Sequence, residues 1–214
     1  MFKRCVKPVA AKPGADPTLV MFSDASEKAM GAVAYIRYEV QDGRYESHLM
    51  ASKSRVAPIE ITSIVRLELS AAVLSKRLAK TIMEETNICF QRVFYIVDSM
   101  IVRAMIQKQS YGFKTFAATR IGEIQRHTDP QDWFWIAGED NVADIISRGT
   151  DPSELKEMKA WQCGPEFLKW SVEEWPTSQS CGSQELPERV KVVLAADVEP
   201  VVTLTSLFES KESW

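Results

Sequence analysis

The sequence predicts an α/β domain built on a five-stranded mixed sheet, with three antiparallel strands, further parallel strands and flanking helices. Three short apolar segments precede a long stretch with helical periodicity, and two more apolar segments then alternate with helices. Strand–helix–strand crossovers are almost always right-handed, so the order βββαβαβα leaves few topologies.

The first three strands are expected at residues 18–24, 31–40 and 44–52. Each is rich in small apolar, β-branched or aromatic residues, which suit a pleated surface. Asp42-Gly43 lies between the second and third and is a strong hairpin signal. These strands therefore form the antiparallel part of the sheet.

A helix of about five turns is expected next, because apolar residues recur every three or four positions. The stripe comprises Ile64, Leu67, Ala71, Leu74, Leu78 and Ile82. Glu68 flanks this stripe, since it lies about 100° from Leu67 around the helix axis. Its carboxylate is therefore expected beside the apolar face.

The remaining elements alternate in the same way. They are expected as a strand at 91–97, helices at 101–106 and 113–125, a strand at 133–136, and a last helix capped by Asn141 and ended by Gly149. Trp133 and Trp135 alternate along their strand, and we expect them to pack in the protein rather than to stack on bases.

Four regions follow from this pattern. Residues 1–18 form an irregular lead-in with three prolines, residues 19–150 the main domain, residues 151–178 a small helical appendage, and residues 179–214 an acidic tail or a border toward another domain. Trp161, Trp170 and Trp175 are expected to hold the appendage against the domain.

Composition excludes several classes of protein. No apolar run approaches a membrane span, and the N-terminus lacks the long apolar region of a secretory signal. Four widely spaced cysteines and two histidines argue against a structural zinc site and favour an intracellular protein with reduced thiols. Residues 20–150 carry sixteen basic and sixteen acidic side chains, so the net charge of −3 reflects the acidic surplus of residues 151–214, which carry six basic and twelve acidic side chains.

Four acidic motifs stand in order along the main domain, around Asp24, Glu68, Asp98 and Asp144. Asp24 and Asp98 each end an apolar strand, at the sheet edge where ligands of α/β proteins gather. A single such carboxylate is usually solvated or caps a helix. Four together in apolar surroundings would repel one another, and a divalent metal is the simplest compensation. The sequence therefore predicts a metal site.

The acidic motifs and the strings around them resemble the ribonuclease H domain of BEL/Pao-type retrotransposon polyproteins, the Pao retrotransposon family. The resemblance covers about residues 19–176. The matching strings lie at residues 22–33, 51–58, 66–72, 97–99, 119–124, 140–149, 152–155, 161–168 and 175–176.

The resemblance implies hydrolysis of the RNA strand of an RNA–DNA hybrid, assisted by two Mg²⁺ ions for which Mn²⁺ can substitute. By position, Asp24 would bridge both ions and Asp144 would complete the ion that activates water. Glu68 and Asp98 would hold the ion near the leaving oxygen. Expected partners are the hybrid and a reverse transcriptase domain, with no membrane and no small-molecule cofactor.

Five further residues are expected to contact nucleic acid, namely Ser26, Lys53, Arg55, Ser99 and Arg148. Short basic clusters are also commonly just solvated, and this alternative stays open for Lys53 and Arg55. We expect Arg66 to face solvent.

Two departures from the family pattern bear on activity. Many ribonucleases H have a histidine shortly before the last aspartate, but residues 129–143 contain none. Polymerase and integrase regions are absent, so the chain is expected to be a polyprotein fragment. A catalytically idle or domesticated remnant that binds nucleic acid or protein is the alternative.

Other enzymes built on similar sheets fit less well. A proofreading-type exonuclease would have a second acidic residue where Ser26 stands, and neither Glu123 nor Glu139 has the spacing from Asp98 that a transposase-like site needs.

Overall fold

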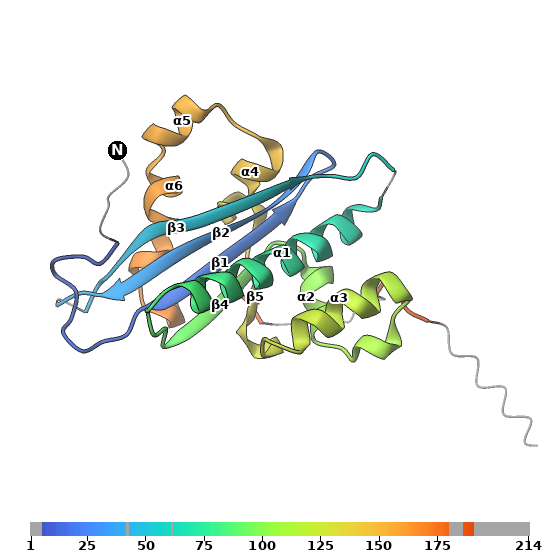
Figure 1. Cartoon of the computed structure of the whole chain (residues 1–214), viewed down its shortest axis with the longest axis horizontal. Helices are drawn as coiled ribbons and strands as arrows, with labels where there is room; N and C mark the ends of the chain where they lie inside the picture. Colours follow the sequence, from blue (N-terminus) through green and yellow to red (C-terminus); the bar gives the residue numbers. More distant parts are fainter. Residues whose placement is uncertain (1–5, 42, 61, 180–185, 191–214) are drawn as a thin grey trace, which may run out of the picture.

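The sheet has five strands in the order β3-β2-β1-β4-β5 (Figure 1). The computed structural model describes residues 6–41, 43–60, 62–179 and 186–190. Asp42 and most of the expected tail lie outside these residues. The strands are β1 (Thr18–Ala25), β2 (Ala29–Glu39), β3 (Tyr45–Val56), β4 (Arg92–Val97) and β5 (Trp133–Trp135).

Strand pairing confirms the expected mixed sheet. β2 is antiparallel to both β1 and β3, whereas β4 is parallel to β1 and to β5. The β2–β3 hairpin closes through a hydrogen bond from Val40 N to Arg44 O of 2.9 Å. Gly43 has a φ of +70°, which its missing side chain makes accessible.

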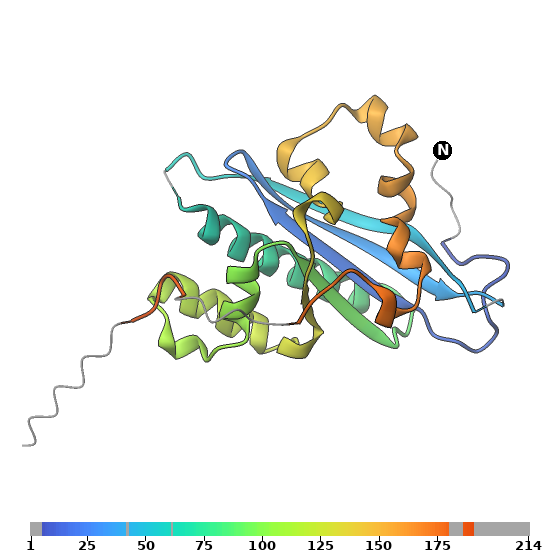
Figure 2. The same cartoon turned by 180° about the vertical axis from the view of Figure 1, so that it is seen from behind.

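The helices form two layers, one on each face of the sheet (Figures 1 and 2). One layer contains α1 (Ile64–Glu85), α2 (Met100–Ile106) and α3 (Thr115–Gln125). The other contains α4 (Asp144–Arg148), α5 (Pro152–Glu157) and α6 (Lys159–Cys163), followed by 3₁₀ turns at Glu166–Lys169 and Val172–Glu174.

Alternation along β1 divides its side chains between the two layers. Leu19 and Met21 join the core under α1 to α3, whereas Val20 and Phe22 join the core on the opposite face. All four are fully buried. Burial of such a side chain contributes about 1.5–3 kcal/mol, so β1 anchors both layers.

Residues 151–178 pack against the second face of the sheet. Trp161 and Trp175 are buried there, as expected, but the prediction for Trp170 is wrong, since 46% of this residue is exposed. Its backbone makes the contact instead, because the carbonyl oxygen of Trp170 accepts a hydrogen bond from the Arg37 guanidinium. Arg37 Nε also donates to Leu168 O over 2.7 Å.

The expected cap of the last helix is also wrong. α4 begins at Asp144 after Ala143, which makes no side-chain cap. Asn141 Nδ2 donates instead to Ser23 O over 3.0 Å, while its Oδ1 accepts from Ala143 N over 3.2 Å. Asn141 thus ties the loop before α4 to β1. Gly149, with a φ of +86°, ends the helix as predicted.

Within the described ranges, no helix is both long and apolar enough to cross a lipid bilayer.

Candidate metal centre

Asp24 and Asp98 lie side by side at the carboxyl edge of the sheet. In the parallel register of β1 and β4, Phe22 is the partner of Ile96. Asp24 and Asp98 each follow two residues later, so they lie on the same face, where neighbouring strands are about 4.8 Å apart. Asp24 is 7% exposed, and a side-chain hydrogen bond joins it to Asp98.

Burial and the nearby charge of Asp24 perturb the pKa of Asp98. Burial, followed by the negative charge of Asp24, raises the pKa of Asp98 to about 7, although a hydrogen bond from Asn141 opposes the shift. A carboxylate shows a raised pKa when its charge is not compensated. The pair is therefore poised to hold a proton or to accept a cation near neutral pH.

Glu68 approaches the pair from α1. Its pKa is also raised, chiefly by burial and further by the negative charge of Asp24, while a hydrogen bond with Ser99 acts in the opposite direction. Ser99 also caps α2 by accepting a hydrogen bond from Val102 N over 3.3 Å. Asp24, Glu68 and Asp98 therefore interact electrostatically, and Ser99 links two of the elements that carry them.

Asp144 lies at the start of α4 and has a different partner. Its Oδ1 accepts a hydrogen bond from Arg148 Nε at 2.5 Å, four residues further along the helix. The Asp144 side chain is 33% exposed and that of Arg148 is 74% exposed. Asp144 therefore already has a cationic partner on its own helix.

Ser147 connects α4 directly to the acid pair. It is fully buried, and its hydroxyl donates a hydrogen bond to Asp24 Oδ2. Its carbonyl oxygen accepts from Ser26 Oγ over 2.6 Å. Two polar contacts therefore fix α4 against the end of β1.

Gly31 lets α4 come close enough for these contacts. It is the antiparallel partner of Asp24 in β2. A Cβ atom at this position would lie 2.4 Å from Ile146 Cδ1, a distance that side chains do not tolerate. The absence of a side chain at Gly31 therefore makes room for Ile146, on the helix that carries Asp144 and Ser147.

The donor chemistry fits a hard divalent cation, although the ligands are not assembled. In the described part of the chain, no group of three or more His, Cys, Asp or Glu side chains is arranged so that it could hold a metal ion. Carboxylate oxygens are nevertheless the preferred ligands of Mg²⁺. The raised pKa values of Glu68 and Asp98 indicate negative charge that a cation would stabilise.

The residues expected to contact nucleic acid fall into two groups. Ser26 and Ser99 form hydrogen bonds within the site, Ser26 with Ser147 O and Ser99 with Glu68. Lys53, Arg55 and Arg148 are exposed. Lys53 and Arg55 lie near the end of β3, which extends four residues beyond its expected end at residue 52. Contact of these five residues with nucleic acid stays a prediction.

Sequence reasoning missed three supports of the site, namely Ser147, Gly31 and Trp135. Trp135 Nε1 donates to Asp98 O over 2.8 Å and so holds the backbone after β4. The spacing of Ser147, three residues after Asp144, could have indicated a neighbour on the same helix face. The partner of each support lies far away in sequence.

Arg66 is partly exposed, since 38% of its side chain is accessible to solvent, but it also has a charged partner. Its guanidinium pairs with Glu188 through two contacts of 3.0 Å. Glu188 follows a segment that sequence reasoning left unassigned, so this pair could not be foreseen.

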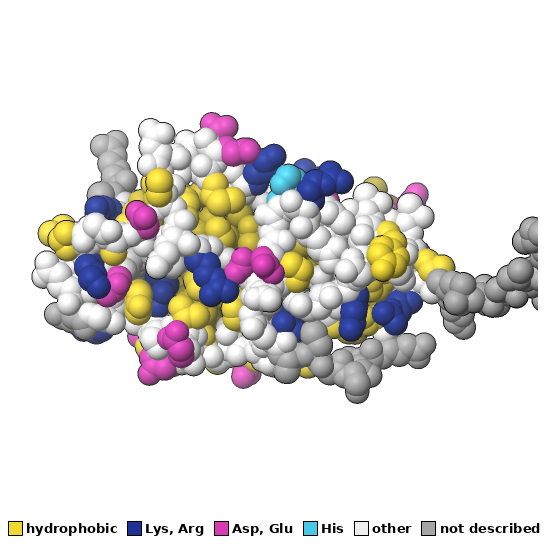
Figure 3. Space-filling view, turned by 90° about the horizontal axis from the view of Figure 1, so that it is seen from below, with side chains coloured by type: hydrophobic (Ala, Val, Ile, Leu, Met, Phe, Trp, Pro, Cys, Tyr) yellow, Lys and Arg dark blue, Asp and Glu magenta, His cyan; other side chains and the backbone are white. Residues whose placement is uncertain are grey.

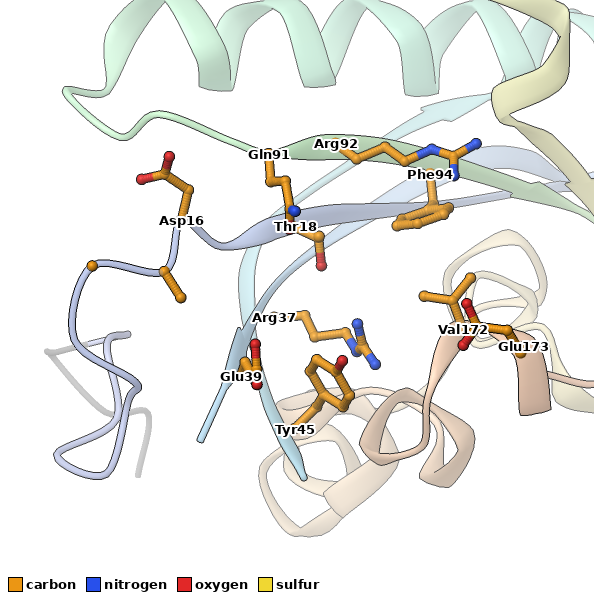
Figure 4. Close-up of a pocket in the computed structure, with 12 residues that line it drawn as sticks. Asp16, Thr18, Arg37, Glu39, Tyr45, Gln91, Arg92, Phe94, Val172 and Glu173 are labelled. Carbon is orange, nitrogen blue, oxygen red and sulfur yellow. The ribbon is translucent and has the colours of Figure 1, made fainter. Parts of the chain in front are cut away.

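A separate pocket of about 660 Å³ lies at the opposite end of β1 and β4 (Figure 4). Thr18, Arg37, Tyr45 and Phe94 line it, and the Arg37 guanidinium lies 3.4 Å from the centre of the Tyr45 ring. Asp24 lies near the other end of β1 and Asp98 follows the other end of β4, so the pocket is not part of the carboxylate site. On the face shown in Figure 3, basic and acidic side chains are interspersed.

A family model matches the N-terminal part of the chain. Residues 1–99 match the family model of the Pao retrotransposon-like RNaseH-like domain. This stretch includes Asp24, Glu68 and Asp98. The predicted resemblance is therefore confirmed over residues 1–99, and the chain has a ribonuclease H-like fold.

Two solved structures are similar at low identity. The N-terminal RNase H domain of rv2228c from Mycobacterium tuberculosis, fused to maltose-binding protein, has 10% identity and a TM-score of 0.37, over 62% of this chain and 98% of that one. RNase H1 from the archaeon Halobacterium salinarum NRC-1 has 12% identity and a TM-score of 0.33, over 59% and 89%. No curated protein matches the chain.

Proposed function

We propose that the chain is a metal-dependent endonuclease that hydrolyses the RNA strand of RNA–DNA hybrids. The observation that carries this proposal is the pairing of the buried Asp24 with the half-buried Asp98 at the sheet edge, with Glu68 near enough to interact with Asp24. The match to an RNaseH-like family supports the reaction class. The acid cluster supplies the ligand chemistry that phosphodiester hydrolysis by metal ions requires.

Asp24, Glu68, Asp98 and Asp144 would hold two Mg²⁺ ions, with Mn²⁺ as a substitute. Two such ions, when bound, supply a nucleophile from water and stabilise the entering and leaving oxygens. The protein contributes the positioning. Ser147 orients the Asp24 carboxylate, and Asn141 ties the loop before α4 to β1.

Asp144 must change partner for the four-carboxylate site to form. Its Oδ1 accepts from Arg148 Nε at 2.5 Å, and a bound cation would compete with that guanidinium. Arg148 is exposed and, once released, could contact a phosphate of the hybrid. Binding of substrate and binding of metal would then favour the same rearrangement.

A hybrid substrate agrees with the arrangement of the exposed groups. Lys53 and Arg55 are two residues apart on β3, so their side chains leave the same face of the sheet. With Ser26, Ser99 and Arg148 they would contact backbone phosphates and 2′-hydroxyls, which carry little sequence information. A reverse transcriptase domain is proposed as an additional partner that strengthens the grip on the hybrid.

A catalytically idle binding module is the second candidate. The observation that favours it is the Asp144–Arg148 pair, in which one expected metal ligand already has a cationic partner. Such a module would bind the hybrid without cutting it.

A cleavage assay on matched labelled substrates tests the proposal. Wild-type protein should cut the RNA strand of a hybrid with Mg²⁺ or Mn²⁺, should leave DNA duplexes intact, and should be inactive in a chelator. Asp98→Asn should abolish the cut without unfolding the protein. Hybrid binding by folded wild type without cleavage in either metal would instead favour the binding module.

A further inference from the structure

Residues 186–190 pack against the helical layer that contains α1 and α3 (Figure 1). Leu186 is 8% exposed and belongs to the core of that layer. The carbonyl oxygen of Glu188 accepts a hydrogen bond from Lys114 N over 2.7 Å, and Val190 N donates to Gly112 O over 3.1 Å. The segment is therefore held by an apolar anchor and by backbone hydrogen bonds.

Glu188 makes the charged contact of this segment. Both of its carboxylate oxygens accept from Arg66, each at 3.0 Å, and this hydrogen-bonded pairing lowers the pKa of Glu188. Among the described residues Glu188 is the only non-glycine with a positive φ, at 60°. A residue with a Cβ atom adopts this conformation at a cost, so the contacts with Arg66 and Lys114 hold it there.

Arg66 is part of a cationic surface on α1 and α3. Arg66 and Arg120 both lie over the Phe116 ring, at 4.8 and 3.5 Å from its centre. Arg120 also lines a neighbouring pocket of about 440 Å³, together with Arg55 and Arg77. We give the name α1–α3 cationic surface to Arg66 and Arg77 of α1, Arg120 of α3 and the neighbouring Arg55 of β3.

Positive charge on this surface is only partly compensated. Burial lowers the pKa of Arg120, and the nearby positive charges of Arg77 and Arg66 lower it further. Glu123 lines the same pocket, but its carboxylate already pairs with Arg77 and Lys76. Glu188 is therefore an anion bound to a surface that retains an excess of positive charge.

We propose that residues 186–190 are an autoinhibitory strap, in which the Glu188 carboxylate occupies on Arg66 the position of a nucleic-acid phosphate. The Arg66 guanidinium can bind a carboxylate or a phosphate through two parallel hydrogen bonds, so Glu188 and a nucleic-acid phosphate compete for it. The strap must leave Arg66 before the whole α1–α3 cationic surface can bind a hybrid backbone. This inference rests on the proposed function, since it takes the hybrid as the ligand.

Binding of a labelled RNA–DNA hybrid to the full 214-residue chain, measured by fluorescence anisotropy in a chelator, tests the strap. Glu188→Gln keeps the shape of the side chain and removes its charge. It should tighten binding about 3–10-fold at low salt, because one ion pair that competes with the hybrid is lost. The logarithm of the affinity should also decrease more steeply with the logarithm of the salt concentration. The slope should be steeper by about one unit, because one more cationic side chain contacts a phosphate.

Glu166→Gln is the matched control. It also removes one negative charge from an ion pair, that with Lys169 at 2.7 Å, but it lies on the opposite side of the sheet. Its effect on affinity should be less than about twofold. If Glu188→Gln changed affinity and salt slope no more than Glu166→Gln does, the strap would be overturned.

Hydrogen exchange provides a readout independent of affinity. Adding hybrid to wild type should speed exchange at the Lys114 and Val190 amides, because the bonds to Glu188 O and Gly112 O open with the strap. Unchanged protection in the bound complex would also overturn the proposal.

The outcomes separate the strap from the proposed function. Tighter binding by Glu188→Gln without RNA cleavage would support the strap and contradict the nuclease. Cleavage with identical binding of Glu188→Gln and wild type would support the nuclease and overturn the strap. Absence of hybrid binding by every variant would overturn both.

Discussion

Ser147 on α4 donates its hydroxyl hydrogen to the carboxylate of Asp24 at the end of β1, across 123 positions of the sequence. The hydroxyl is fully buried, and the carboxylate is nearly so. This bond joins the last helix of the carboxylate site to its first strand. It explains how a helix of only five residues can be positioned in the site.

Ser147→Ala should therefore destabilise the protein by about 1–3 kcal/mol, because a buried carboxylate loses a hydrogen-bond donor. Urea denaturation measures the change in the free energy of unfolding. Ser54→Ala, on an exposed position of β3, is the control and should change stability by less than about 0.5 kcal/mol. Equal effects of the two substitutions would show that the Ser147 bond does not stabilise the site.

Gly31→Ala should force the Ile146 side chain of α4 to shift. The new Cβ would meet Ile146 Cδ1 at 2.4 Å, so a loss of about 1–3 kcal/mol is expected. Adding Ile146→Ala should recover part of this loss, giving non-additive effects in thermal melts. Gly112→Ala is the control, because a Cβ there has no atom within 4 Å. A Gly31→Ala protein as stable as this control would refute the close approach.

The acid pair predicts a pH dependence of stability in the absence of divalent ions. Burial and the charge of Asp24 raise the pKa of Asp98 from 3.8 in the unfolded chain to about 7 in the folded one. The folded state therefore binds a proton that the unfolded state releases. This contribution to stability is full below about pH 4 and is lost as the pH rises through 7.

Denaturation of wild type in a chelator should accordingly give a lower free energy of unfolding at pH 8 than at pH 5. Asp98→Asn cannot ionise and should reduce that difference by about 1–2 kcal/mol, after allowance for partial exposure. Asp16→Asn, at an exposed position, is the control. A pH profile of Asp98→Asn that coincides with wild type would contradict the repulsion between Asp24 and Asp98.

Arg37→Lys should loosen the segment that follows α6. The planar guanidinium of Arg37 donates to both Leu168 O and Trp170 O. A lysine has a single ammonium group and cannot reproduce this pair of hydrogen bonds. The expected loss is about 1–3 kcal/mol, with faster hydrogen exchange between residues 166 and 175. Arg126→Lys, on an exposed position, should leave both unchanged. Unaltered exchange in Arg37→Lys would show that other contacts hold the segment.

Periodic patterns were sufficient to predict the elements that carry the site. A short apolar run located β1 within one residue of its ends, and the apolar stripe located α1 from its first residue, Ile64. The position of Asp24 beside Asp98 followed from two parallel strands that end at one sheet edge. These features depend on local spacing and on a general rule of topology.

Contacts between distant segments could not be predicted in the same way. The partners of Ser147, Asn141 and Arg66 lie 123, 118 and 122 positions away. These residues come into contact only because α4 and residues 186–190 pack closely against the rest of the protein. The closeness of that packing depends on side-chain volumes, as at Gly31. Asp144 and Arg148 are close in sequence, so their pairing could have been considered. It was not predicted, because the expectation for Asp144 rested only on its suitability as a metal ligand.

The rate at which Asp24→Asn cuts the RNA strand of a hybrid, relative to wild type in Mg²⁺, tests the central claim most directly. Loss of the central carboxylate should slow cleavage about a thousandfold or more, because several kcal/mol of transition-state stabilisation are lost and each 1.4 kcal/mol is worth about tenfold. Circular dichroism should show that the variant stays folded. A folded Asp24→Asn that cuts within about tenfold of the wild-type rate would contradict the proposed carboxylate site.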